Sequence, residues 1–335
     1  MVHTRRRRLM APAALLAAAA MLAGCSGGGT GDSESDDATV RIGAMYLDSQ
    51  GYYGGVRAGV QQAGDASGVQ VDIIESTSSG DVAKESSFMS SLIASGVDAI
   101  IMSVVSSDGS VAAVKQAFDA GIPVICYNTC VNDEATEQYV TAYILGDPVE
   151  FGRMLGEFAG NYFSEAGVTA PAMGVVNCEQ YEVCQQRMEG FQAALQEMLP
   201  DAAIAANQQG TEADEAISIA EQMLTSNPEI NGMYGESGGA TVGAFKSVQN
   251  REMTGQIVAF GSDMTTDIAT ALKDGTVLKA VVDISGIAVG KLAFASAQDA
   301  IAGNTPADKV VPAPIELYTP DDAQAWMDTH PDGLP

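Results

Sequence analysis

Short apolar runs alternate with helical segments along most of the chain, and this alternation limits the possible folds more than any other feature of the sequence. The apolar runs are rich in Val and Ile, as in Val69–Glu75 and Val277–Asp283. Continuous runs of this kind are typical of strands that helices cover on both faces. The sequence therefore predicts an α/β fold built from doubly wound parallel sheets.

The number of strand–helix units predicts two sheets rather than one. Roughly 295 residues lie beyond position 40, which is enough for two lobes with a core each. The expected strands are Val40–Leu47, Val69–Glu75, Asp98–Val104, Pro123–Tyr127, Ala172–Asn177, Ala203–Gln209, Ile230–Tyr234, Gln256–Ser262 and Val277–Asp283. Because ligands bind at the carboxyl ends of such strands, we select the loops after Leu47, Glu75, Met102, Tyr127, Asn177, Tyr234, Ser262 and Asp283.

The first residues indicate export from the cytoplasm. Arg5–Arg8 precede the apolar run Leu9–Met21, which has about the length of a signal-peptide core and is short for a membrane span. The next residues, Leu-Ala-Gly-Cys25, resemble the lipobox of bacterial lipoproteins; the alternative is an ordinary signal peptide with a chance cysteine. We expect residues 1–24 to be a lipoprotein signal peptide and Cys25 to carry lipid. Residues 25–39, rich in Gly, Ser and Asp, are expected to form a flexible tether.

The charge balance excludes one class of partner. The chain has 16 Lys and Arg, four of them in the expected signal peptide, and the remaining 12 against 43 Asp and Glu give a formal net charge near −31. Such a chain cannot neutralise phosphates, so nucleic acid is not expected as a partner. We expect an extracytoplasmic protein that touches the membrane only through its lipid anchor.

Several segments, in order along the chain, carry a resemblance to a known family. They are VRIGAMYLDSQGYYGGVRAGVQQAG, SLIASGVDAIIMSVVSSDG, AFDAGIPVICYNT, RMEGFQAAL and GSDMTTDIATALKDG. Together they resemble the ribose-binding-protein family of type I periplasmic binding proteins, the solute receptors of sugar ABC importers. The resemblance implies two Rossmann-like lobes joined by a three-strand hinge, a monomer, ABC permease subunits as partners, and neither a cofactor nor enzymatic activity. The implied lobes are residues 40–146 plus 284–312 and residues 147–283 plus 313–335.

The same resemblance implies a set of ligand-binding residues. The family's paired aromatic residues fall on Tyr52 and Tyr53, and an aromatic ring can stack on the apolar face of a sugar. The family has an R-x-R-x-x-G-F motif. Its first arginine falls on Gln185, and its second arginine, which more often braces the structure, matches Arg187. The complete expected set is Gln50, Tyr52, Tyr53, Asn128, Thr129, Gln185, Glu236, Ser237, Asp263 and Asp283.

The chemistry of this set indicates the class of ligand. Asn128 and Thr129 stand where the family has an Asp-Arg pair, so aromatic, amide, hydroxyl and carboxylate groups remain with hardly a cation. Acidic or phosphorylated sugars would require Arg or Lys. We therefore expect a neutral sugar or polyol. A cationic ligand held by tyrosines and carboxylates, a nucleoside and a signalling ligand are the alternatives.

An enzymatic interpretation competes with the receptor. Gly235-Glu236-Ser237-Gly238-Gly239 fits the G-x-S-x-G nucleophile elbow of serine hydrolases, between an expected strand and helix. The hydrolase would need a histidine base within hydrogen-bond reach of the serine. His330 is the only histidine beyond the signal peptide and lies in a Pro/Gly-rich tail. The binding interpretation is therefore favoured, and a zinc site with histidine ligands is not expected.

Four cysteines remain beside Cys25, and each pair follows an expected strand. They are Cys126, Cys130, Cys178 and Cys184. An even number in an oxidising compartment favours disulfides over metal or redox chemistry, although an all-thiolate zinc site stays open. In a hinged receptor, bridges between the lobes would hold the cleft shut. We therefore expect the local pairs Cys126–Cys130 and Cys178–Cys184, which would stiffen two binding loops.

Overall fold

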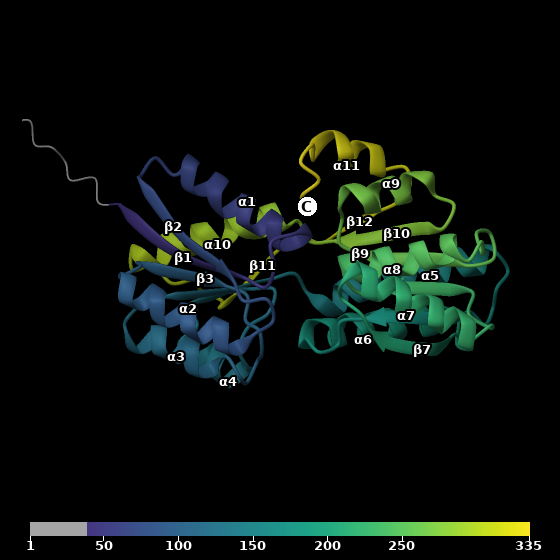
Figure 1. The fold of residues 1–335 in the computed structure, drawn as a ribbon, viewed down its shortest axis with the longest axis horizontal. Coiled ribbons are helices and arrows are strands. Elements are labelled where there is room, and N and C mark those ends of the chain that lie inside the picture. The colour runs from purple at the N-terminus through teal and green to yellow at the C-terminus, as the bar shows by residue number, and fades with distance from the viewer. Residues whose placement is uncertain (1–38) are drawn as a thin grey trace, which may run out of the picture. The chain divides into compact units, whose positions relative to one another are not determined.

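A computed structural model describes residues 39–335. The expected signal peptide, the expected lipid site at Cys25 and almost all of the expected tether lie outside the described residues. The described chain contains two six-stranded sheets, each between two layers of helices (Figure 1). In residues 39–335 no helix combines the length and the apolar character that crossing a membrane requires.

The first sheet has the strand order β11-β5-β4-β3-β1-β2, and all of its strands are parallel. Its strands are β1 (Val40–Tyr46), β2 (Val71–Thr77), β3 (Ala99–Met102), β4 (Val124–Tyr127), β5 (Ala142–Leu145) and β11 (Val310–Pro312). Its helices are α1 (Gly51–Ala66) and α10 (Gly286–Ile301) on one face, and α2 (Val82–Ser95), α3 (Val111–Asp119) and α4 (Asp133–Tyr139) on the other. Alternate residues of β1 supply both faces: Ile42 packs with α1 and α10, and Met45 packs with α2 and α3.

The second sheet has the order β12-β10-β9-β8-β6-β7, and only β12 runs antiparallel to its neighbour among these strands. Its strands are β6 (Ala172–Asn177), β7 (Ala203–Gln209), β8 (Gly232–Gly235), β9 (Val258–Ser262), β10 (Leu278–Asp283) and β12 (Glu316–Tyr318). Two helices cover one face of this sheet, α5 (Pro148–Glu165) and α6 (Glu182–Met198). Four helices pack in the hydrophobic core on the other face, namely α7 (Ala213–Ser226), α8 (Gly238–Asn250), α9 (Thr266–Asp274) and α11 (Ala323–Thr329).

Three segments connect the sheets, since the chain passes from β5 to α5, from β10 to α10 and from β11 to β12. We call the two halves the first lobe and the second lobe, after their sheets. The predicted α/β fold with two parallel-sheet lobes and three connections is confirmed. The sequence did not predict α4, β11, β12 or α11. β11 and β12 have three residues each, too few to show a period in the sequence.

Candidate ligand-binding cleft

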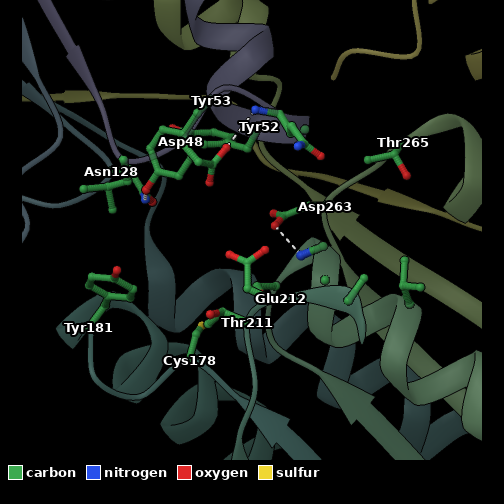
Figure 2. Close-up of a pocket in the computed structure, with 18 of the residues that line it drawn as sticks. Asp48, Tyr52, Tyr53, Asn128, Cys178, Tyr181, Thr211, Glu212, Asp263 and Thr265 are labelled. Atoms are coloured by element: carbon green, nitrogen blue, oxygen red, sulfur yellow. Dashed lines mark hydrogen bonds between the residues drawn. The ribbon is translucent and has the colours of Figure 1, made fainter. Parts of the chain in front are cut away.

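A cleft of about 920 Å³ lies where loops of both lobes face each other (Figure 2). Its walls come mainly from the segments that follow β1, β4, β6, β7, β8 and β9. These segments lie at the carboxyl ends of parallel strands, where ligands bind in doubly wound sheets. The fold therefore brings six of the expected site residues to one cavity, namely Gln50, Tyr52, Tyr53, Asn128, Ser237 and Asp263.

Two tyrosines and an asparagine form the wall of the first lobe. The rings of Tyr52 and Tyr53 meet edge to face, with their centroids 5.2 Å apart. The Asn128 side chain donates a hydrogen bond from Nδ2 to the Tyr53 hydroxyl, at 3.0 Å. Tyr143 donates from its hydroxyl to the Asn128 carbonyl oxygen, at 2.6 Å. The Tyr53 hydroxyl is therefore engaged within the first lobe, whereas the hydrogen bonds found among the described residues include none from the Tyr52 hydroxyl.

The Asn128 loop is held in an unusual backbone conformation. Asn128 has φ +58°, in the left-handed region that asparagine tolerates better than most residues. A disulfide joins Cys126 to Cys130 around it, with their Cα atoms 5.5 Å apart. Thr129 is buried and does not line the cleft; its hydroxyl donates to the Val104 carbonyl oxygen, at 2.7 Å. Thr129 therefore supports the loop from behind.

Asp263 is the central carboxylate of the second lobe. It also has a left-handed backbone, with φ +62°, directly after β9. Its Oδ2 accepts a hydrogen bond from the Gly238 N–H at the start of α8, at 2.8 Å. Burial raises the pKa of Asp263, while the Arg187 guanidinium and the Gly238 N–H act in the opposite direction. Non-glycine residues with left-handed backbones are uncommon, and they often occur at binding sites.

Ser237 caps a helix in this structure. Its Oγ accepts from the Ala240 N–H at the start of α8, at 3.4 Å. The proposed hydrolase base, His330, stacks on Trp326 with the ring centroids 4.5 Å apart, and its Nδ1 lies 2.8 Å from the Trp326 carbonyl oxygen. The hydrogen bonds found for these two side chains do not join them to each other.

Arg187 lines the cleft, and Gln185 does not. The Arg187 side chain is 7% exposed, its guanidinium lies 4.2 Å from the centroid of the Phe151 ring, and its Nη1 donates to the Glu236 carbonyl oxygen. Its buried Nε has no hydrogen-bond partner in the described chain. Gln185 is exposed and donates to the Glu179 carbonyl oxygen. The resemblance implies a ligand contact at Gln185, whereas Arg187 is the one of these two residues that lines the cleft.

The helical period explains this difference. Residues 185 and 187 lie about 200° apart around α6, so only one of them can face the cleft. Val183 and Cys184 are buried and line the cleft, and Arg187 follows them at the spacing of one helical turn. The helix itself is fixed by close contact with α5, because a Cβ on Gly152 would lie 1.8 Å from the Arg187 carbonyl oxygen. Backbone contact between the helices therefore positions Arg187.

Carboxylates surround the cleft more densely than the sequence indicated. Asp48 follows β1, and Glu212 follows β7; both are exposed and line the cleft. Although the Asp48 side chain is exposed, the walls of the cleft remove part of its hydration and raise its pKa, and the Gln50 N–H acts in the opposite direction. The like charges of Glu212 and Asp263 from the opposite lobe raise the pKa further. The loop after β7 was not among the selected loops, although the same strand-end rule applies to it.

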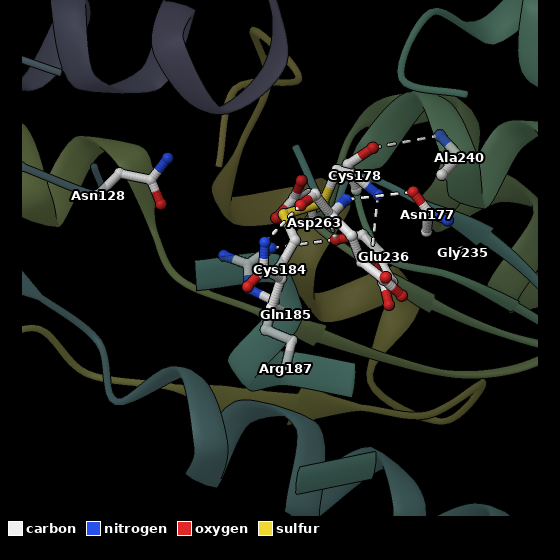
Figure 3. Close-up of a disulfide and its surroundings, with 12 residues drawn as sticks. Asn128, Asn177, Cys178, Cys184, Gln185, Arg187, Gly235, Glu236, Ala240 and Asp263 are labelled. Carbon is white, nitrogen blue, oxygen red and sulfur yellow. Dashed lines mark hydrogen bonds between the residues drawn. A yellow bond between two sulfur atoms is a disulfide. The ribbon is translucent and has the colours of Figure 1, made fainter. Parts of the chain in front are cut away.

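The second disulfide joins Cys178 to Cys184 at the base of the cleft (Figure 3). It closes the loop that carries Tyr181, and Figure 2 shows this ring across the cavity from Asn128. The Tyr181 N–H donates to the Cys178 carbonyl oxygen, at 3.0 Å. Both expected pairings are confirmed. The all-thiolate zinc site is therefore wrong, because all four sulfur atoms are used in disulfides.

Glu236 and Asp283 lie behind the walls of the cleft. Glu236 is fully buried and its Oε2 accepts from the Cys178 N–H, at 3.0 Å. Asp283 is 2% exposed and its Oδ1 accepts from the Met264 N–H, at 2.8 Å. Burial raises the pKa of Glu236 and that of Asp283 to about 8. Neither lines the cleft, so both serve to hold the loops that do.

These two pKa values predict how stability depends on pH. Because the folded-state pKa values lie above those of the unfolded chain, the stabilisation is complete below about pH 4 and is lost as pH rises to about 8. Each group should lower the free energy of unfolding by up to about 1.4 kcal/mol per pH unit in this window. Urea denaturation from pH 5 to 8 should show a shallower decrease in Glu236→Gln than in the unmodified chain. Equal slopes would contradict the assignment.

Comparisons with known proteins agree with this geometry. A model of the periplasmic binding protein domain matches residues 44–305. The ABC transporter periplasmic-binding protein YphF of Escherichia coli is 51% identical over 297 residues, which are 88% of this chain and 91% of that protein. The D-ribose/D-allose-binding protein of Pseudomonas aeruginosa is 28% identical over 255 residues, 71% of this chain and 75% of that protein.

Solved structures share the fold. A Mycobacterium smegmatis protein in complex with β-D-fucofuranose has a TM-score of 0.79 and 23% identity, and the match covers 88% of this chain and 95% of that one. A solute-binding protein from Bacillus halodurans with bound myo-inositol has a TM-score of 0.78 and 19% identity, covering 88% and 99%. The family match excludes the hydrolase alternative. The chain belongs to the periplasmic binding protein family and is an extracytoplasmic, non-enzymatic solute-binding protein of an ABC transporter.

Proposed function

We propose that this protein binds a neutral sugar or polyol between its lobes and delivers it to ABC permease subunits, as a monomer anchored by lipid on Cys25. The proposal rests on the different chemical groups that the two lobes present to the cleft. One lobe presents the Tyr52 ring, and the other presents Arg187 beside Asp263. An aromatic face suits the apolar side of a sugar ring, and a donor beside an acceptor suits its hydroxyl groups. Relatives and structural neighbours that bind sugars or polyols support the same class of ligand.

Each cleft residue has a proposed role. Tyr52 stacks on the ring, and Asn128 orients a hydroxyl from the side of the first lobe. Arg187, whose Nε has no hydrogen-bond partner among residues 39–335, donates to the ligand, and Asp263 accepts. Gln50 and Ser237 complete the direct contacts at the edge. Thr129, Glu236 and Asp283 act through the loops they support, and Gln185 lies outside the cleft.

A cationic ligand is the second candidate, and one observation favours it. Asp48, Glu212, Asp263 and Asp267 give the cleft four carboxylates against the single guanidinium of Arg187. When the cleft closes, like charges from opposite lobes come closer together, and an amine on the ligand would relieve their repulsion. Binding of a cation should then weaken with added salt more than binding of a neutral sugar.

A thermal-shift screen tests the class of ligand. A compound that binds only the folded state raises the melting temperature, by an amount that grows with its concentration. We expect at least one aldose, ketose or polyol to raise it, and amino acids, polyamines and nucleosides to leave it unchanged. A shift that only amines cause would replace the neutral ligand with the cationic one.

The lipid anchor has its own test. Because the lipid would be attached to the Cys25 sulfur, Cys25→Ser should move most of the protein from the membrane fraction to the soluble fraction after export. Ser26→Ala, a change at the next position, should leave the protein with the membranes. If Cys25→Ser still sediments with membranes, the lipoprotein part of the proposal is wrong, and sugar binding is unaffected by that result.

A further inference from the structure

The segment after α11 contacts both lobes. α11 belongs to the second lobe, where Ala323 and Trp326 are buried in the core beside α9. Figure 1 shows α11 above α9 and the end of the chain beside the first turns of α1. Residues Gly333–Pro335, which we call the strap, therefore pass from one lobe to the other.

The second-lobe end of the strap is held in a tight turn. The Gly333 N–H donates to the His330 carbonyl oxygen, at 2.9 Å, and Gly333 has φ +69°. A Cβ at this position would lie 2.1 Å from the Thr266 Oγ1, at the start of α9. Gly333 also lines the cleft. A side chain at residue 333 is therefore excluded both by the backbone conformation and by contact with the second lobe.

The other end of the strap is held by the first lobe. The Pro335 oxygen accepts from the Ile287 N–H in the first turn of α10, at 2.8 Å, and Pro335 is buried. The neighbouring helix α1 leaves room for it, because a Cβ on Gly55 would lie 2.4 Å from the same oxygen. The Leu334 side chain packs against Gly54, where a Cβ would lie 3.0 Å from Leu334 Cδ2.

The strap has too few residues to bridge a wide gap between the lobes. Three extended residues span at most about 10 Å, so the lobes cannot separate far while both of its ends stay bound. Its first-lobe anchor, Ile287, lies close to the connection from β10 to α10, one of the three that join the lobes. We propose that the strap is a fourth, non-covalent link between the lobes. It holds the lobes toward the closed arrangement and so reduces the lobe separation that ligand binding must close. Its use in ligand capture rests on the proposed function, but the link itself consists of contacts within the chain.

Spin labels on Lys84→Cys and Glu215→Cys would measure the separation of the lobes in the sugar-free protein. Both residues are exposed and lie in the first turns of α2 and α7, at the cleft side of their lobes. Removing residues 332–335 from the full chain should lower the ratio of short to long distances by about three- to tenfold, the effect of one hydrogen bond and a small apolar contact. Gly333→Ala should act in the same direction.

Two further measurements make the result decisive. Asp332→Asn changes an exposed residue beside the strap and should leave the distances unchanged. Hydrogen exchange of the Ile287 N–H should accelerate in both strap variants. If that N–H exchanges faster while the distances stay the same, the strap does not control the lobes and the proposal is wrong. If the deletion does not fold, Gly333→Ala decides by the same distances. Because no sugar is present, failure of the ligand proposal cannot cause either result.

Discussion

Asp263→Asn should weaken binding of the transported sugar by about tenfold or more while leaving the fold intact. Asparagine keeps the size of the side chain and tolerates the left-handed backbone at this position. It removes the charge and one acceptor, so a ligand hydroxyl that the carboxylate accepted from becomes poorly paired inside the closed cleft. Calorimetric titration with the sugar that gives the largest thermal shift would measure the loss.

The matched control is Asp201→Asn. It makes the same chemical change on an exposed residue that does not line the cleft. The affinity of this variant should equal that of the unmodified chain. If Asp263→Asn binds as tightly as Asp201→Asn, Asp263 does not contact the ligand and the proposed second-lobe wall is wrong.

Gly152→Ala should destabilise the protein by about 3 kcal/mol, because the new Cβ would overlap the Arg187 carbonyl oxygen and push α6 away from α5. Displacing α6 also moves the guanidinium in the cleft, so sugar affinity should decrease in the same variant. Urea denaturation measures the first effect and calorimetric titration the second.

Gly64→Ala is the control for this substitution. Gly64 is also helical, in α1, but the atoms nearest to a Cβ there lie 3.7 Å away, an ordinary contact distance. Removing a glycine from a helix without a clash should stabilise the protein by about 0.5–1 kcal/mol. The two variants are thus expected to change stability in opposite directions. Equal effects would show that α5 and α6 do not approach as closely as described.

The elements that the sequence predicted correctly share a physical cause. Strands such as β3 and β9 are buried on both faces, so their apolar runs are continuous and easy to recognise. The missed elements are held by tertiary contacts instead. β12 has three residues and pairs antiparallel with β10, and α11 has seven residues anchored by Trp326. Elements this short carry too little pattern to be distinguished from loops.

The site was predictable to the extent that strand ends define it. Asn128 and Asp263 follow strands directly, and Tyr52 lies at the start of the helix after β1, so the topology brings all three to one cavity. Motif spacing predicts a bracing role for Arg187, because spacing alone does not show which face of α6 meets the cleft. Glu212 follows β7, a strand whose end is not among the loops selected from the sequence. The burial of Thr129, Glu236 and Asp283 depends on side-chain packing that sequence spacing does not contain.

Hydrogen exchange with and without the bound sugar tests the central claim most directly, because it reports where on the chain a ligand acts. The account predicts that one sugar slows exchange in both lobes together, in residues 127–130 of the first and in residues 178–184 and 263–266 of the second. Asp263→Asn should reduce this protection at equal sugar concentration. Protection confined to one lobe, or protection outside the cleft with these loops unchanged, would contradict a receptor that closes on its ligand between two lobes.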